Sequence, residues 1–454
     1  MKPVRPFILL LMYIATAAAQ TAPPSPLLKP DDRLKADVLL IVAHPDDETG
    51  VAAYLAQLED EHKRVAVVYM THGEAGHNSM GPERAASLGA VREMELRHAQ
   101  TALGIHNVWF LDGRDTPSQN VLQSLANWRH GLALEEVVRM VRLTRPEVIL
   151  TWLPGFFIGE NHGDHQASGV VATEAFDLAG DPAAFPAQLA GATRANETWL
   201  DGLQPWQPKK IYYFSDASDN SRFHNAGPSY ANTAISPSRK LPYWRIAMDV
   251  FRFHLSQYRG YIERLGKLDD QQLAAELKGW GESTQLTFGK SNVAGSMTGD
   301  VFEGVTSGRI PFAGIAREPY EQPPALSVEL GGPWGFYEKF RREHGLKNLP
   351  VASIPEISIK RGATLQIPLE LRNDAKSAQS VSISLKLPEG WTTESGAGTY
   401  SLDAQNSYHA QVTLTAPKAE TTTMQEIQCQ AESGGRTIGV IKLNVRLAGG
   451  GLPQ

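Results

Sequence analysis

The stretch ADVLLIVA, residues 36–43, is followed directly by HPDDE, residues 44–48, where an apolar run changes abruptly to polar residues. A continuous apolar run of this length, rich in branched side chains, is typical of a strand buried on both faces of a parallel sheet. Similar runs lie at 64–71, 107–111, 147–152 and 210–214. Helical patterns separate them, at 50–63, 84–104, 134–144 and 166–178. The alternation predicts an open, mostly parallel α/β sheet with helices on both faces.

The segment after the first run carries one histidine and three carboxylates, at positions 44 and 46–48. In such a sheet, ligands bind beyond the carboxyl ends of the strands, which is where this segment begins. Crowded carboxylates raise one another's pKa, and a divalent cation would relieve the repulsion. An exposed acidic turn that caps the next helix explains the same residues, so this segment alone leaves both interpretations open.

A second polar segment, NHGDH at 161–165, follows the fourth apolar run and precedes a predicted helix. It therefore falls on the same edge of the sheet as the first segment. A catalytic zinc takes three nitrogen or oxygen ligands and keeps one position for water. His44, Asp47 and His165 would meet that count.

The motifs together resemble the PIG-L / LmbE-like family of zinc-dependent N-acetylglucosaminyl deacetylases, which have a Rossmann-like sheet. The resemblance covers roughly residues 36–215 and extends toward the His-x-Ser-Gln segment at 254–257. It is carried by AHPDDE at 43–48, TxGE at 71–74, LGxxRxxE at 88–95, LG at 103–104, RP at 145–146 and HGDH at 162–165.

The resemblance implies a role for each matching residue. The implied zinc ligands are His44, Asp47 and His165. Asp46 would be the general base that takes a proton from water. His162 would stabilise the charged intermediate or assist the leaving amine, Asp164 would hold His162 by a hydrogen bond, and Arg92 would contact substrate. The tyrosine that stabilises the oxyanion in some members is not identified, and Gly163 stands where the family usually has proline.

Other polar residues have two interpretations. His72 and His77 would line the pocket or have no functional role, and Asp115 would reach the site or cap a turn. His254 and Gln257, one turn apart on a helix predicted over 243–265, are expected to pack or to make a structural hydrogen bond rather than bind metal.

From about residue 350 the apolar period changes to two, which predicts a small antiparallel, immunoglobulin-like β-sandwich over 350–447. LPEGW at 387–391 resembles the NEW3-type domains of secreted carbohydrate-active proteins. We expect Trp391 in the sandwich core, or in contact with sugar. The expected organisation is therefore a deacetylase domain over 36–330 and an accessory sandwich, with a linker or seam around 323–350.

Residues 1–19 combine a short basic start, an apolar run and small residues, the pattern of a secretory signal peptide. A retained membrane anchor is the alternative. With the signal cleaved we expect no stable membrane insertion, and a periplasmic or extracellular protein. The formal net charge of −6 disfavours nucleic acid as a partner. A single cysteine, Cys429, excludes an intrachain disulfide, and nothing in the sequence indicates an oligomeric state.

The function expected from this sequence is zinc-dependent hydrolysis of the N-acetyl group of an N-acetylglucosamine-type amino-sugar conjugate, with release of acetate. Two alternatives remain. One is a metal-dependent hydrolase of another amide or ester. The other is a carbohydrate-binding protein whose hydrolase domain is inactive.

Overall fold

The computed structural model describes residues 30–155, 162–189, 203–215, 225–276, 281–315, 317, 324–349, 354–419 and 424–448 of the 454-residue chain. The expected signal peptide, residues 1–19, lies outside these ranges. Within them, no helix is both long and apolar enough to cross a membrane.

A six-stranded sheet in the order β3-β2-β1-β4-β5-β8 forms the first domain. Its strands are β1 (Val38–Val42), β2 (Val65–Tyr69), β3 (Asn107–Phe110), β4 (Val148–Trp152), β5 (Lys210–Phe214) and β8 (Thr287–Ser291). The first five are parallel and coincide with the five predicted runs, so that prediction is confirmed. Strand β8 was not predicted, and it pairs antiparallel with β5 at the sheet edge.

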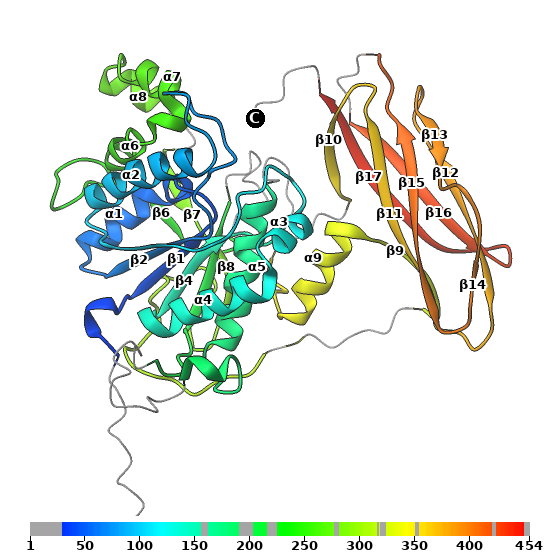
Figure 1. Ribbon diagram of the computed structural model, residues 1–454, viewed down its shortest axis with the longest axis horizontal. Helices are drawn as coiled ribbons and strands as arrows, with labels where there is room; N and C mark the ends of the chain where they lie inside the picture. Colours follow the sequence, from blue (N-terminus) through cyan, green and yellow to red (C-terminus); the bar gives the residue numbers. More distant parts are fainter. Residues whose placement is uncertain are drawn as a thin grey trace, which may run out of the picture.

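Two layers of helices cover the sheet (Figure 1). Successive residues of β1 enter opposite cores, since Leu39 and Ile41 pack in one buried cluster and Val38, Leu40 and Val42 in the other. The first cluster is covered by α3 (Val121–Asn127), α4 (His130–Thr144) and α5 (Gly163–Leu178). The second is covered by α1 (Ala52–Asp60), α2 (Ala86–Leu103) and α6 (Tyr243–Phe251). Coverage on both faces explains why β1, β2 and β4, which are buried at every position, read as apolar runs.

The helix predicted over 243–265 is two helices, α6 and α7 (Leu255–Leu265). The chain leaves helical geometry at His254, which is fully buried and points toward Glu48 of the polar segment after β1. A buried ion pair at the break outweighs the local preference for one continuous helix. The same region also holds α8 (Asp270–Glu276) and a short antiparallel pair, β6 (Ser229–Ala231) with β7 (Ser283–Gln285), whose strands are separated in the chain by three helices.

The second domain is the expected β-sandwich, with sheets in the orders β10-β17-β16-β12-β14 and β13-β15-β11-β9. Its strands are β9 (Leu326–Leu330), β10 (Glu356–Lys360), β11 (Thr364–Asn373), β12 (Gln379–Lys386), β13 (Thr392–Ser395), β14 (Gly398–Leu402), β15 (Asn406–Thr415), β16 (Gln425–Ser433) and β17 (Arg436–Ala448). The pairings are antiparallel except β10 with β17, which is parallel. Trp391 is buried in this core and donates its indole N–H to Gln425, so it is a packing residue.

The chain crosses between the two domains more often than the expected boundaries at 330 and 350 allow. Strand β9 belongs to the sandwich, because it pairs with β11. Helix α9 (Gly332–Glu343), which follows at once, returns to the first domain, where Tyr337 and Phe340 lie in the same buried cluster as α3, α4 and α5. Figure 1 shows α9 between the two domains. Just after this helix, Nδ1 of His344 lies 2.6 Å from the Asp177 carboxylate of α5.

Candidate metal centre

Three segments meet at the carboxyl edge of the parallel strands. Strand β1 leads to His44 and Asp47, β3 leads to Asp115, and β4 precedes His162 and His165 at the start of α5. The two polar segments singled out in the sequence, far apart along the chain, are therefore neighbours. This is the edge where open α/β sheets bind ligands.

The two carboxylate oxygens of Asp47 have different surroundings. Oδ2 accepts three hydrogen bonds, from the backbone N–H of Ala43 (2.8 Å) and His44 (2.9 Å) and from the Trp152 indole N–H (2.7 Å). Oδ1 instead lies 3.2 Å from Nε2 of His165 and 3.6 Å from Nδ1 of His44. Burial opposes ionisation of Asp47, but the two imidazoles hold its pKa well below the usual range. The carboxylate thus stays charged and presents one oxygen toward two histidines.

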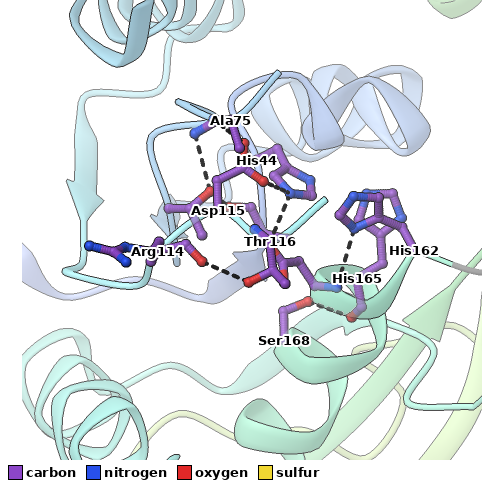
Figure 2. Close-up of polar contacts among 12 residues, drawn as sticks. His44, Ala75, Arg114, Asp115, Thr116, His162, His165 and Ser168 are labelled. Carbon is purple, nitrogen blue, oxygen red and sulfur yellow. Dashed lines mark hydrogen bonds and ion pairs between the residues drawn. The ribbon is translucent and has the colours of Figure 1, made fainter. Parts of the chain in front are cut away.

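The imidazole of His44 lies between carboxylates on both sides, and Figure 2 shows Asp115 on one of them. Nδ1 faces Asp47, and Nε2 lies 3.4 Å from both Asp115 and Asp164. Burial opposes the charged ring, but the charge of Asp47 and the closeness of the three carboxylates raise the pKa of His44. Despite burial, His44 and the Ala75 backbone N–H lower the pKa of Asp115 to about 2. Of the two roles considered for Asp115, reaching the site or capping a turn, the structure supports the first, because its carboxylate lies beside His44.

These residues have the composition of a divalent-metal site. Two overlapping groups have ligand atoms within 4.8 Å of one another: His44, His162 and His165, and His44, Asp115 and Asp164. A metal-binding histidine usually donates its second ring N–H to a carboxylate or carbonyl. In His44, Nδ1 faces Asp47 and is the nitrogen that could bind a metal. Nε2 faces the carboxylates of Asp115 and Asp164, to which it could donate the second ring N–H. Binding through Nδ1, together with Asp47 and His165, would leave Nε2 of His44 to donate its proton to Asp115 or Asp164.

Asp164 does not hold His162 through its carboxylate, and this expectation was wrong. The carboxylate oxygen Oδ2 of Asp164 accepts a hydrogen bond from the Thr116 backbone N–H (2.8 Å) and faces His44. The contact between the two neighbours is instead the backbone N–H of Asp164, which donates to Nδ1 of His162 (3.2 Å). Helix α5 begins here, so His162 caps the helix with its ring while the Asp164 side chain turns into the core. The Asp164 carboxylate thus lies 3.4 Å from Nε2 of His44 and is not directed toward His162.

His162 lies against the other two histidines of the site. Its ring centroid is 4.7 Å from that of His44 and 5.0 Å from that of His165. Burial and the charges of these neighbours lower the pKa of His162 to about 4. Its ring is therefore neutral at physiological pH in the metal-free protein. Since Nδ1 accepts a hydrogen bond, the ring proton is assigned to Nε2.

Asp46 is held by a residue that sequence analysis did not identify. The Tyr258 hydroxyl lies 2.8 Å from Oδ2 of Asp46, and the charge of Asp46 together with burial raises the pKa of the phenol, so Tyr258 is the donor. Burial and the neighbouring charge of Asp47 raise the pKa of Asp46. Tyr258 interrupts the helical geometry of α7, with φ −126° and ψ 22°. Its position directly after the His-x-Ser-Gln segment was the one available signal.

The His-x-Ser-Gln segment, residues 254–257, links the start of α7 to the polar segment after β1. His254 pairs with Glu48 at 2.7 Å, both fully buried, and Gln257 donates to the Pro45 carbonyl (2.6 Å). Ser256 donates to Glu95 on α2 from both its backbone N–H and its hydroxyl. The expectation that His254 and Gln257 make structural hydrogen bonds is confirmed.

Arg92 is buried beneath the loop that follows β2. It donates to the His77 carbonyl (3.1 Å). A Cβ at Gly73, where φ is +67°, would lie 2.6 Å from the guanidinium, so the loop requires glycine there. The structure places Arg92 close enough to lower the pKa of Asp46 by its charge, a tendency that burial outweighs. Substrate contact by Arg92 stays a prediction.

The two histidines of uncertain role lie in the same loop. His72 stacks on Phe110 with a centroid distance of 4.7 Å, and its Nδ1 lies 3.6 Å from Glu93. The His77 side chain is exposed. Neither contacts the three carboxylates around His44, and pocket lining stays a prediction for both.

Both domains match known protein families in sequence. Residues 39–176 match the family model described as GlcNAc-PI de-N-acetylase (PIG-L), and residues 359–433 match that of the NPCBM-associated, NEW3 domain of alpha-galactosidase. A 1D-myo-inositol 2-acetamido-2-deoxy-alpha-D-glucopyranoside deacetylase of Catenulispora acidiphila is 33% identical over 46% of this chain and 68% of its own length. Its counterpart in Streptomyces scabiei is 34% identical over 41% of this chain and 57% of its own.

Among solved structures, N,N′-diacetylchitobiose deacetylase from Pyrococcus horikoshii aligns at 19% identity with a TM-score of 0.40, over 56% of this chain and 84% of that one. The matched part of this chain spans 68% of the length of the Catenulispora relative and 57% of the length of the Streptomyces relative. On the sequence match to its first domain, the chain belongs to the PIG-L (GlcNAc-PI de-N-acetylase) family.

Proposed function

We propose that this protein is a zinc-dependent deacetylase that hydrolyses the N-acetyl group of an N-acetylglucosamine-type conjugate and releases acetate. The proposal rests mainly on the different surroundings of the two carboxylate oxygens of Asp47. One oxygen is fully hydrogen-bonded and the other faces His44 and His165, while Asp46 lies one residue away. Two histidines and one carboxylate are a common ligand set of catalytic zinc.

The proposed ligands are His44, Asp47 and His165. When bound, Zn²⁺ would supply Lewis-acid polarisation of the acetyl carbonyl and lower the pKa of water to roughly 7. Zinc rather than another divalent ion is proposed because imidazole together with carboxylate suits it.

Asp46 is proposed as the general base. Its pKa is raised by burial and by the charge of Asp47, which makes its carboxylate a stronger base than an exposed aspartate. The hydrogen bond from Tyr258 fixes the direction of one oxygen of Asp46, Oδ2. The other oxygen, Oδ1, is left to take a proton from the attacking water. The water that has lost this proton attacks the amide carbon. The same carboxyl can then return the proton to the nitrogen as the C–N bond breaks, which leaves acetate and the free amine.

His162 was expected either to stabilise the charged intermediate or to assist the leaving amine. Its neutral ring, with the proton on Nε2, favours the first role, because it can donate a hydrogen bond to a developing oxyanion without carrying a charge beforehand. Removing such a donor costs roughly 100- to 1,000-fold in kcat in other acyl-transfer enzymes.

The substrate class is proposed from the relatives, two of which are named for 2-acetamido-2-deoxyglucose conjugates of inositol. A glycan outside the cytoplasm is the proposed substrate here, because residues 1–19 have the pattern of an export signal. Cell fractionation tests the location: full-length protein confined to the cytosol with residues 1–19 intact would contradict export.

The activity is tested by an acetate-release screen over N-acetylated glycans with added Zn²⁺, in parallel with Asp46→Asn. We expect the variant to keep bound zinc and to lose most activity. An unchanged rate in the variant would contradict the assignment of the base. Release of acid only from other amides or esters would favour a different hydrolase, and a protein without zinc that is insensitive to chelators would favour a carbohydrate-binding role.

A further inference from the structure

Trp152, the last residue of β4, contacts two of the three proposed metal ligands. Its side chain is 3% exposed, and it pairs across the sheet with Phe214 of β5. Nothing in the sequence distinguished it from the rest of a buried strand. The structure places it between Asp47, which follows β1, and His165 on α5.

The indole N–H is one of three donors to Oδ2 of Asp47, at 2.7 Å. The other two are backbone groups of the strand–turn junction, and they come from the same segment as Asp47 itself. Trp152 is therefore the donor that ties this carboxylate to a different strand. With Oδ2 saturated by three donors, Oδ1 is the oxygen left for a metal ion.

The indole ring sets the plane of the second ligand. The rings of Trp152 and His165 are parallel within 3°, with centroids 4.2 Å apart. Phe214 also packs on the indole at 4.3 Å, which restricts its movement. In addition, Gly169, one turn after His165 on α5, has no room for a Cβ because the Trp152 carbonyl lies against it. The backbone of β4 is thus held close to the helix that carries His165.

We propose that Trp152 is a positioning residue of the metal centre, which presents Oδ1 of Asp47 and the imidazole of His165 to the ion in one fixed relative orientation. The inference rests on the metal site of the proposed function. It does not depend on the identity of the substrate, because its consequence is metal affinity. Residues that orient metal ligands typically contribute about 10- to 100-fold to metal affinity or activity.

The test compares Trp152→Phe and Trp152→Leu with Trp206→Phe in the full-length chain. The first variant removes the N–H and keeps an aromatic ring, and the second removes both. Trp206 is a matched control, since it is 5% exposed and its indole donates to the Pro146 carbonyl (2.7 Å) before β4, at the opposite edge of the sheet. Zinc affinity is measured by competition with a chromogenic chelator, and the visible spectrum of the Co²⁺-substituted protein reports ligand geometry.

We expect zinc to bind about 10-fold more weakly to Trp152→Phe and up to about 100-fold more weakly to Trp152→Leu, with an altered Co²⁺ spectrum. Trp206→Phe should lose stability on thermal unfolding without a change in either metal readout. Equal zinc affinity in wild type and Trp152→Phe would overturn the inference, as would equal losses in Trp152→Phe and Trp206→Phe. A wild-type protein that binds no zinc would instead contradict the proposed function.

Discussion

Substitution of either member of the buried pair Glu48 and His254 should strongly destabilise the first domain. Both side chains are fully buried, with His254 Nε2 2.7 Å from Oε1 of Glu48. The other oxygen, Oε2, accepts from the Tyr69 hydroxyl at 2.9 Å. In His254→Ala the carboxylate would stay buried with its cation removed, which costs about 3–5 kcal/mol. Tyr69→Phe removes one neutral donor to the same carboxylate and should cost about 1.5–3 kcal/mol.

A second substitution separates the lost charge partner from the cavity that alanine leaves. If the unpaired carboxylate is the cause, Glu48→Gln in the His254→Ala background should restore part of the stability, because it removes the buried charge. If the cavity is the cause, the added substitution should restore nothing. The assay is urea unfolding of the metal-free protein, followed by hydrogen exchange of the first domain so that unfolding of the sandwich does not contribute.

The pH dependence gives an independent check. Burial disfavours the charged ring of His254, but the charge and hydrogen bond of Glu48 raise its pKa above the unfolded value of 6.5. A group whose pKa is raised on folding contributes stability that is complete below pH 6.5 and is lost as the pH rises through the folded pKa. The stability difference between wild type and His254→Ala should therefore shrink above pH 6.5. A difference that stays constant from pH 5 to 9, or grows at alkaline pH, would refute this reasoning.

Three further predictions concern separate parts of the chain. Tyr258→Phe removes a hydrogen bond to the charged form of Asp46, so the acid limb of the kcat/KM profile should move to higher pH; an unmoved limb would argue against Asp46 as the base. Phe340→Ala should destabilise the first domain by about 3–5 kcal/mol in thermal unfolding, since this α9 residue is 4% exposed in that core, and a loss confined to the sandwich would contradict the packing. Burial raises the pKa of the Cys429 thiol to about 11, so native protein at pH 7 should react with thiol reagents only after denaturation, which an absorbance titration would show.

The sequence was sufficient to predict the sheet and the edge where the site lies, for a physical reason. A strand covered on both faces is almost entirely apolar, so β1 and β4 read as apolar runs, and the polar segments that follow them mark the edge of the sheet. Ligand residues that directly follow such runs, as His44 and Asp47 do, are therefore placed by the strand itself.

Contacts between segments far apart in the chain carried no such signal. Tyr258 and Asp46 are 212 residues apart, and their hydrogen bond depends on how α7 breaks and docks. Adjacency was misleading for Asp164, because the first turn of a helix directs neighbouring side chains away from each other, and His162 and Asp164 end on different partners. The sequence shows Trp152 only as a strand residue, because its contacts with Asp47 and His165 depend on how the segment after β1 and helix α5 pack against β4.

The path of the chain through α9 limits how the sandwich can act. A domain attached by one linker can move away from its partner, or be cleaved off, without loss of packed core. Here β9 is a ladder strand of the sandwich, while the helix that follows it buries Tyr337 and Phe340 in the first domain. The Tyr337 ring leaves no room for a Cβ at Gly155, which closely follows β4 and Trp152. To separate the domains, the protein would have to break either the β9–β11 ladder or the core contacts of α9. Through β9 and α9, the sandwich is therefore linked to the segment that follows Trp152, which Tyr337 contacts at Gly155. Loss of the sandwich should lower the stability of the first domain.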